Sequence, residues 1–268
     1  MTIKVNSKIE TAKKGEKALS LKNRFKPEAD LIIINGFPAD DNTEIKENDE
    51  IILIKKNCVP TMEEMEYMLT SRHTPKIHNK LKNASVAIAG LGGLGSNAAV
   101  SLARMGIGRI KLVDFDIVEP SNLNRQYYFI PQIAMKKTDA LEETIKKLNP
   151  LTKIEKADII VTESNISEIF SDFDVILECF DNKDTKAMFV ANVLKKLPKS
   201  FLVAASGVAG IFSHKLIKTK TLGKSCVIIG DFENEAAQGM GLMATRAAIA
   251  ANIQANIAVR HILGESDE

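Results

Sequence analysis

The stretch Val86-Ala87-Ile88-Ala89-Gly90-Leu91-Gly92-Gly93-Leu94-Gly95-Ser96 decides the fold of the larger part of this 268-residue chain. Its first four residues are apolar and predict a buried strand, and a helical pattern follows from Ser96 to Met105. Glycines let a backbone approach a phosphate closely, and the free N–H groups and dipole of a helix N-terminus favour an anion. The stretch therefore predicts a phosphate-binding turn. The glycines that can line it are Gly90, Gly92, Gly93 and Gly95.

Beyond this turn, strand patterns alternate with helical patterns. The amphipathic segment 137–148 ends at Asn149-Pro150 and predicts a helix, and two short added strands are expected at 215–217 and 227–229. This alternation predicts an α/β fold over residues 84–268, a Rossmann-like doubly wound and mostly parallel sheet with its ligand crevice at the carboxyl ends of the strands. The other strands are expected at 109–115, 154–157, 174–179 and 201–205, and the other helices at 166–170, 183–197 and 242–263.

The first 57 residues predict a separate small domain. Short strand-like runs surround a helical segment at 18–25, which predicts a ubiquitin-like β-grasp domain over residues 1–57. The Ile-Asn-Gly turn at 34–36 and the Asn48-Asp49-Glu50 step resemble the ubiquitin-like sulfur carriers of the ThiS type. Carriers end in a flexible Gly-Gly carboxylate, whereas this chain continues past the last strand. We therefore do not expect a working carrier.

Residues 58–83 are expected to form a linker and a connecting helix. Thr61 and Glu64 have the S/T-x-x-E spacing of a capping box, so the helix should run to about Leu69.

Composition limits the partners and the location of the protein. Its 36 Lys and Arg against 34 Asp and Glu leave a formal net charge of +2, so neither nucleic acid nor an anionic membrane is an expected partner. No apolar run of about 18 residues occurs and no secretory signal follows Met1, so a soluble, cytoplasmic protein is expected. Cys58, Cys179 and Cys226 contain no Cys-x-x-Cys pair, which excludes a tetracysteine zinc site and favours reduced thiols.

Charged residues gather after the predicted strand ends. Asp114 can accept hydrogen bonds from ribose hydroxyls, and with the glycines it also satisfies the G-x-G-x-x-G pattern of an NAD site. Arg125 and Lys137 can stabilise further phosphates, and Asp181 can hold Mg²⁺. A nicotinamide site needs neither the extra cations nor a metal. The glycines and these charged residues together therefore favour a binding site for a triphosphate over one for a nicotinamide cofactor.

These residues resemble the ThiF/MoeB/HesA adenylyltransferases, the bacterial relatives of ubiquitin-activating enzymes. The resemblance covers roughly residues 70 to 264 and is closest to a zinc-free ThiF subgroup with an N-terminal ThiS-like domain, because the paired-cysteine zinc motif of the family is missing from the sequence. The residues that carry it are Gly90 to Ser96, Asp114-Phe115-Asp116, Ser121 to Gln126, Lys137, Asp181-Asn182, Gly241 to Ala244 and Gln254 to Asn256.

The resemblance implies ATP and Mg²⁺ as ligands and a role for each residue. Gly93 would contact the nucleotide, Asp114 the ribose, Arg125 and Lys137 the phosphates, and Asp181 the magnesium ion. Supporting polar contacts are expected from Asp116, Asn122, Gln126 and Asn182.

The resemblance also implies partners. Family members are homodimers in which an arginine of one subunit reaches the γ-phosphate in the other, and Arg72 is the candidate because no other arginine lies between Phe25 and the glycine turn. The C-terminal glycine carboxylate of a ubiquitin-like sulfur carrier would attack the α-phosphorus of ATP and give acyl-AMP and pyrophosphate. The cations and the metal would neutralise the developing charge, and the ionised carboxylate needs no general base. ThiS of thiamine biosynthesis is the expected carrier, and a MoaD-like carrier is the alternative.

Simpler roles exist for several of these residues. Arg125 can be a surface ion-pair residue, Lys137 an exposed helix cation, and Asp181 a cap for the helix at 183–197. Asp116 can merely support its loop, and only the family spacing favours Lys137 over Lys136.

Cys226 is the one cysteine in the crossover region, where some family members carry a sulfur-transferring cysteine. It heads a β-rich run, so we expect a buried packing residue rather than a nucleophile.

Two other functions fit parts of the sequence. An NAD(P)-dependent oxidoreductase would use the glycines with Asp114. A non-catalytic scaffold would place its N-terminal domain in its own carrier groove as a regulatory mimic.

Overall fold

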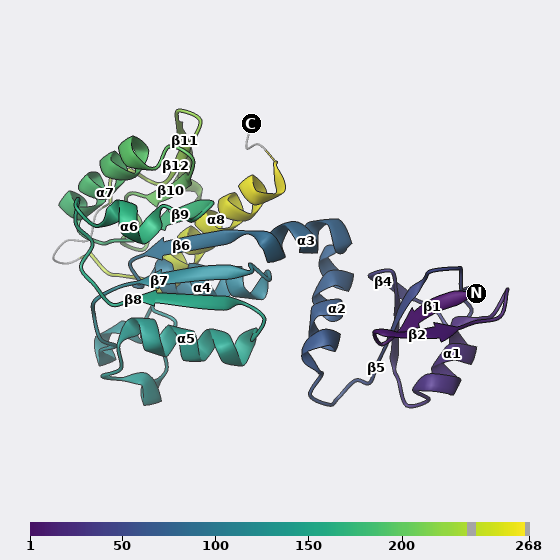
Figure 1. The fold of residues 1–268 in the computed structure, drawn as a ribbon. Coiled ribbons are helices and arrows are strands. Elements are labelled where there is room, and N and C mark those ends of the chain that lie inside the picture. Colours follow the sequence, from purple (N-terminus) through teal and green to yellow (C-terminus); the bar gives the residue numbers. More distant parts are fainter. Residues whose placement is uncertain (235–239, 266–268) are drawn as a thin grey trace. The chain divides into compact units, whose positions relative to one another are not determined.

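The computed structural model describes residues 1–234 and 240–265 and divides the chain into two compact units, Met1–Asn79 and Lys80–Glu268 (Figure 1). The elements of the first unit are β1 (Thr2–Val5), β2 (Lys8–Thr11), α1 (Ala18–Phe25), β3 (Leu31–Ile34), β4 (Phe37–Ala39), β5 (Glu50–Ile54) and α2 (Met62–His73). The strands form a mixed sheet of order β2-β1-β5-β3-β4, in which β1 and β5 run parallel and the other pairs antiparallel. The predicted small mixed β-sheet domain is confirmed.

The strands β3 and β5 of the first sheet are buried on both faces. One face packs on α1, whose Ala18 and Leu21 belong to the larger apolar cluster of the unit. The opposite face carries Ile33, Ile52 and Ile54, each at most 2% exposed, and Tyr67 of α2 packs against them. Because successive side chains of a strand point to opposite faces, the isoleucine runs of β3 and β5 supply both layers.

Helix α2 therefore belongs to the first unit. The predicted capping box of Thr61 and Glu64 is present, and the helix runs to His73, four residues beyond the predicted end. Tyr67 Oη donates to Glu50 Oε1 at 2.6 Å, and Lys26 Nζ contacts Glu64 Oε1 at 2.7 Å. These contacts fasten the helix to the strands and to the end of α1.

The second unit is a seven-stranded sheet of order β11-β12-β10-β9-β6-β7-β8, parallel except for β11. This confirms the predicted mostly parallel Rossmann-like sheet. Its strands are β6 (Ser85–Ala89), β7 (Arg109–Val113), β8 (Lys153–Ala157), β9 (Val175–Glu178), β10 (Phe201–Ala205), β11 (Lys218–Leu222) and β12 (Cys226–Gly230). Its helices are α4 (Gly95–Arg104), α5 (Lys137–Leu148), α6 (Ile166–Phe170), α7 (Lys183–Lys196) and α8 (Ala244–Leu263), and α3 (Pro75–Asn83) spans the boundary between the units.

One strand prediction was wrong. A 3₁₀ turn at His214–Leu216 replaces the strand expected at 215–217, and β11 follows it. Ser213 Oγ accepts a hydrogen bond from Lys215 N and caps this turn. All residues of β11 are exposed, so this edge strand lacks the apolar pattern that identifies buried strands.

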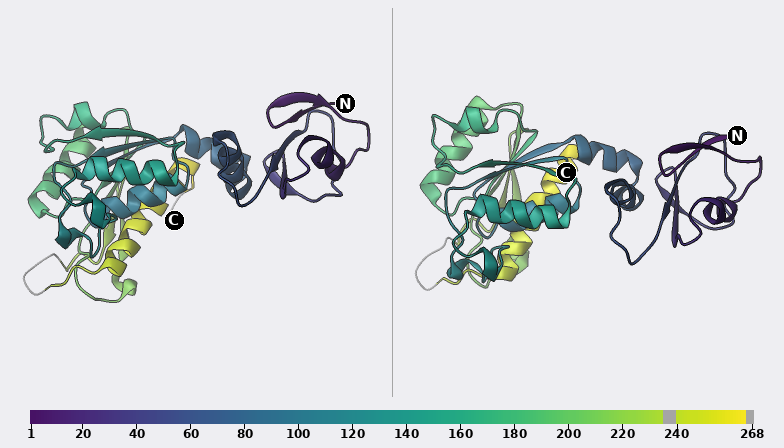
Figure 2. Two further views of the ribbon diagram at one scale, coloured as in Figure 1. Left: turned by 90° about the horizontal axis from the view of Figure 1, so that it is seen from below. Right: turned by 60° about the horizontal axis from the view of Figure 1, so that its bottom comes forward.

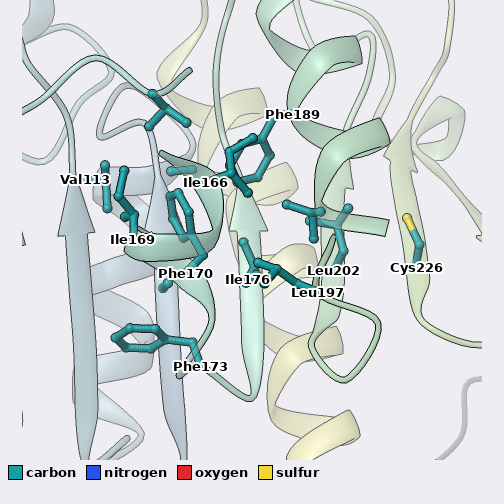
Figure 3. Packing of buried hydrophobic residues seen from close by; sticks show 14 residues of the cluster. Val113, Ile166, Ile169, Phe170, Phe173, Ile176, Phe189, Leu197, Leu202 and Cys226 are labelled. Atoms are coloured by element: carbon teal, nitrogen blue, oxygen red, sulfur yellow. The ribbon is translucent and has the colours of Figure 1, made fainter. Parts of the chain in front are cut away.

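Helices cover both faces of the second sheet. Helix α4 packs against α5 and α8 on one face, and α6 and α7 pack together on the other (Figures 1 and 2). Beneath α6 and α7, Phe170 and Phe189 meet edge to face with their ring centroids 5.1 Å apart (Figure 3). Within the described ranges, no helix is long and apolar enough to cross a membrane.

The strand order creates a switch point between β6 and β9. From β6 the chain builds β7 and β8 to one side, then returns to place β9 on the other side. Connections leave in opposite directions at the carboxyl ends of β6 and β9, and this is where sheets of this kind bind ligands. The glycine turn follows β6 and Asp181 follows β9, so the sheet brings both to the same edge.

Candidate nucleotide site

The four glycines of the turn fall into two pairs. Gly90 has a φ of +91°, and a Cβ atom there would lie 2.9 Å from Cys179 O, while a Cβ on Gly95 would lie 1.9 Å from Gly90 O. At Gly92 the nearest atom to a Cβ is Gln126 Nε2 at 4.0 Å, and at Gly93 the distances are 3.5 Å or more. Close packing thus explains Gly90 and Gly95, whereas a Cβ on Gly92 or Gly93 would make only ordinary van der Waals contacts, mainly with the segment that contains Arg125 and Gln126.

Hydrogen bonds fasten the turn to that segment. Ser96 Oγ donates to Gly92 O at 2.7 Å and accepts from Tyr127 N at 2.9 Å. Asn97 Nδ2 donates to Gly93 O and to Arg125 O, at 2.8 and 3.0 Å. Sequence reasoning assigned no role to Asn97, although its place in the first helical turn after the glycines was the available signal.

Tyr128 also holds the glycine turn in place, and the sequence did not predict this role. Its buried Oη donates to Leu91 O at 2.8 Å. Burial raises the pKa of Tyr128, and the charges of Asp114 and Asp116 add to the effect, so the phenol stays a donor at neutral pH.

Asp114, Asp116 and Lys137 form one chain of contacts beside the turn. Asp114 is buried, and its carboxylate accepts from Leu91 N at 2.6 Å and from Asp116 N at 2.9 Å. Lys137 Nζ lies 2.8 Å from Asp116 Oδ2, and its side chain is 7% exposed. An exposed helix cation at Lys137 is therefore the wrong interpretation. Lys136 is the exposed lysine, and it pairs with Asp158.

Arg125 is half-buried. Its Nη1 donates to Ser121 O at 3.2 Å and to Asn124 Oδ1 at 2.8 Å, and it makes no ion pair within the part of the chain that the structure describes. Next to it, Gln126 is buried and its Oε1 lacks a partner among the described residues. An open hollow of about 310 Å³ lies here. Its lining is Asn97, Leu123, Asn124, Arg125, Gln126, Ala244, Thr245 and Ala248.

Asn122 and Asn182 have local roles. Asn122 Oδ1 accepts from Glu119 N at 3.0 Å and caps the 3₁₀ turn Pro120–Asn122, which shapes the loop before Arg125. Asn182 Oδ1 accepts from the N–H groups of Asp184 and Thr185 at 2.9 and 3.0 Å and caps α7. A capping role for Asp181 is thus wrong.

Asp181 itself is exposed, and its carboxylate makes no hydrogen bond or ion pair with another described residue. Mg²⁺ is usually bound by one or two carboxylates together with substrate phosphates, so a free carboxylate at this sheet edge fits the ion. Arg72 belongs to the first unit, in the last turn of α2, where it is exposed and pairs with no described residue.

Two buried ion pairs near the strand ends were not predicted. Glu178 ends β9 and pairs with Lys186 of α7, and Asp231 pairs with Arg246 of α8. Burial raises the pKa of Glu178 and outweighs the opposing charge of Lys186 and the hydrogen bonds that the carboxylate accepts. For Asp231 burial is outweighed by hydrogen bonds, mainly from the backbone of Asn234, and by Arg246, so its pKa is lowered. A glutamate at the end of an apolar strand was the signal for the first pair.

The cysteines near the sheet are packing residues. Cys226 is fully buried in the cluster beneath α7 (Figure 3), and burial, assisted by the charge of Glu178, raises its pKa to about 11. Burial likewise raises the pKa of Cys179. Both thiols stay protonated and shielded, as expected from the sequence, and Cys58 is the exposed one.

The fold is of the Rossmann-like α/β class, and a glycine turn at the switch point, with an acid after the next strand and cations beside it, is the arrangement with which proteins of this class bind nucleotides. The model of the ThiF family matches residues 67–268, and the chain belongs to that family. A second model, ThiS-like ubiquitin, matches residues 1–57.

Curated relatives match only part of the chain. The adenylyltransferase and sulfurtransferase UBA4 of Kluyveromyces lactis is 37% identical over 128 residues, which are 47% of this chain and 29% of that protein. Ubiquitin-like modifier-activating enzyme 5 of Oryza sativa subsp. japonica is 31% identical over 150 residues, 51% of this chain and 35% of that protein. The chain thus covers only about a third of the length of these relatives.

Solved structures share the fold. The tRNA N6-threonylcarbamoyladenosine dehydratase TcdA of E. coli in complex with AMP has a TM-score of 0.69 at 21% identity, covering 77% of this chain and 97% of that one. Its complex with ATP has a TM-score of 0.68 at 22% identity and covers the same shares. MccB of E. coli has a TM-score of 0.59 at 20% identity, covering 77% and 65%.

Proposed function

We propose that the protein is an ATP-dependent adenylyltransferase that activates the C-terminal carboxylate of a ubiquitin-like carrier protein. One observation carries the proposal: no described carboxylate pairs with Arg125, and its side chain lies beside the half-buried backbone of Gly93. Such a cation suits a phosphate group, because a guanidinium can donate two parallel hydrogen bonds to phosphate oxygens. Membership of the ThiF family, and curated relatives with adenylyltransferase in their names, support the same chemistry.

In the proposed reaction a carboxylate oxygen of the carrier attacks the α-phosphorus of ATP. The bond from this phosphorus to the bridging oxygen breaks, and pyrophosphate leaves with the electron pair. Lys137 and Arg125 would bind phosphate oxygens, and Asp114 would exchange its contact with Leu91 N for a ribose hydroxyl or share the two. Mg²⁺, when bound at Asp181, would supply charge neutralisation for the leaving pyrophosphate. Two anions must meet here, so electrostatic stabilisation should provide most of the rate.

The carrier and the assembly are further parts of the proposal. We infer a ThiS-like carrier in a sulfur-transfer pathway such as thiamine biosynthesis, supported by the ThiS-like model that matches residues 1–57. A MoaD-like carrier would use the same site chemistry. The protein would act as a homodimer in which Arg72 of one subunit reaches the γ-phosphate bound by the other. The exposure of Arg72 and its lack of a described partner support this role.

Carrier-dependent exchange of labelled pyrophosphate into ATP tests the proposal. Purified ThiS-like and MoaD-like proteins would be supplied one at a time, with a carrier lacking its terminal glycine as control. Exchange should require one intact carrier, and Arg125→Ala should reduce it by about 10²–10³-fold. Tight ATP binding with no exchange for any carrier would refute the proposal, and micromolar binding of NADH without ATP binding would instead indicate an oxidoreductase.

A further inference from the structure

A buried polar cluster lies beneath the turn that carries Asp181. Glu178 Oε1 accepts from Phe180 N at 2.7 Å, and both carboxylate oxygens accept from Lys186 Nζ at 3.0 Å. The same ammonium group donates to Ala205 O at 2.9 Å. Two side chains thereby join the end of β9, the first half of α7 and the end of β10.

The cluster is costly for the fold, which makes its placement informative. Glu178 is fully buried, and the removal of a carboxylate from water is repaid only if its partners are well placed. A well-packed apolar pair of similar volume often gives equal or greater stability. An apolar pair would, however, leave Phe180 N and Ala205 O without these partners. The ion pair therefore serves to fix the backbone geometry at the ends of β9 and β10 rather than to increase the net stability of the fold.

The geometry that the pair fixes belongs to the nucleotide site. The backbone after Glu178 is held at two points, because Cys179 N donates to Ala89 O at 2.8 Å and Phe180 N donates to Glu178 Oε1. The next residue is Asp181, whose own side chain has no described partner to orient it. Its position relative to the glycine turn thus depends on the backbone that Glu178 and Lys186 hold.

We propose that Glu178 and Lys186 are positioning residues that set Asp181 against the glycine turn for a metal-bound nucleotide. This inference rests on the proposed function, because it assumes that Asp181 faces the metal of bound ATP. Gln254 supports the arrangement from α8, since its Nε2 donates to Glu178 O at 3.0 Å and to Val203 O at 3.2 Å. The two strands therefore stay paired when the ion pair is removed, and the turn alone should loosen.

The test uses the full chain with Lys186→Met and, as a milder change, Glu178→Gln, which keeps an acceptor for Phe180 N. Ser85→Ala is the matched control, because Ser85 N and Oγ of β6 donate to Asp174 Oδ2 at 2.8 and 2.7 Å, next to the start of β9 and thus at the opposite end of that strand from Glu178. ATP affinity would be measured by calorimetry across a Mg²⁺ titration, and amide hydrogen exchange would be followed at residues 179–182.

We expect both pair variants to need at least ten times more Mg²⁺ for half-maximal ATP binding, with ATP affinity in EDTA within twofold of the wild type. Exchange at Phe180 should rise at least tenfold, and Lys186→Arg should restore both properties in part. The Ser85→Ala control should lose stability without either change. Folded pair variants with wild-type Mg²⁺ dependence would overturn the inference and leave the adenylyltransferase proposal intact. If the pair variants show the shifted Mg²⁺ dependence but the wild-type protein catalyses no pyrophosphate exchange with any of the carriers, the adenylyltransferase proposal would be refuted and the positioning role supported.

Discussion

Replacement of single glycines in the turn separates its structural part from its ligand-facing part. In Gly95→Ala the new Cβ would lie 1.9 Å from Gly90 O, about 1.5 Å short of ordinary contact. The obstructing atom is a backbone carbonyl oxygen and cannot rotate away, so the cost should reach about 3 kcal/mol, the upper end for overpacking. The better helix propensity of alanine returns about 1 kcal/mol. A net loss of about 2 kcal/mol lowers the melting temperature of a domain of this size by roughly 4–8 °C.

Gly92→Ala is the matched change in the same turn. The nearest atom to its Cβ lies 4.0 Å away, so stability should stay within about 0.5 kcal/mol of the wild type. The new methyl group at position 92 would instead obstruct a phosphate group of the nucleotide, so the affinity for ATP should fall at least tenfold. Thermal unfolding and ATP calorimetry on both variants measure the two effects. Wild-type stability of Gly95→Ala would refute the described turn, and wild-type ATP affinity of Gly92→Ala would refute its orientation toward the nucleotide.

Three further predictions concern side chains of the second unit. Lys137→Met should lower pyrophosphate exchange about 10²–10³-fold, whereas exposed Lys136→Met should leave it within twofold; equal losses would contradict the assignment. Cys226→Ala should retain exchange after correction for folded protein, because the buried thiol cannot act as a nucleophile; a complete loss in folded enzyme would disprove this. Asp231 has a folded-state pKa below its usual value of 3.8, so the stability that it contributes is present above that value and is lost as the pH falls through the lower folded pKa. Urea unfolding of Asp231→Asn should therefore show lower stability at pH 7 and a flatter decline of stability in acid, and an unchanged dependence of stability on acid pH would exclude this contribution of the Asp231 carboxylate.

The sequence predicts the architecture well because the sheet is built from local patterns. The helix expected at 137–148 has those bounds in the structure, and the buried strands lie within a residue or two of their apolar runs. The failure at 215–217 has the same origin, since Leu216 and Ile217 form an apolar pair while the real strand is an exposed edge of Lys and Thr. Periodicity identifies buried faces and gives little information on an edge strand.

The site is predicted less completely, because its contacts join residues far apart in the chain. Glycines and acids at strand ends could be recognised one segment at a time. The link from Asn97 to Arg125, and that from Glu178 to Ala205, exist only once the strand order is known. The choice between Lys136 and Lys137 shows the same limit, since burial separates two adjacent lysines that the sequence makes equivalent.

The distribution of charge around the turn supports a metal-bound triphosphate over a bare dinucleotide. Lys137 is already paired with Asp116, whereas Arg125 and Asp181 have no ion-pair partner among the described residues. A free cation thus lies beside Gly93 and a free carboxylate follows β9. A diphosphate without metal could satisfy Arg125 but would bring its negative charge toward an uncompensated Asp181. A nucleotide that carries Mg²⁺ presents phosphate oxygens to the arginine and a cation to the aspartate, so both charges are compensated by a single ligand.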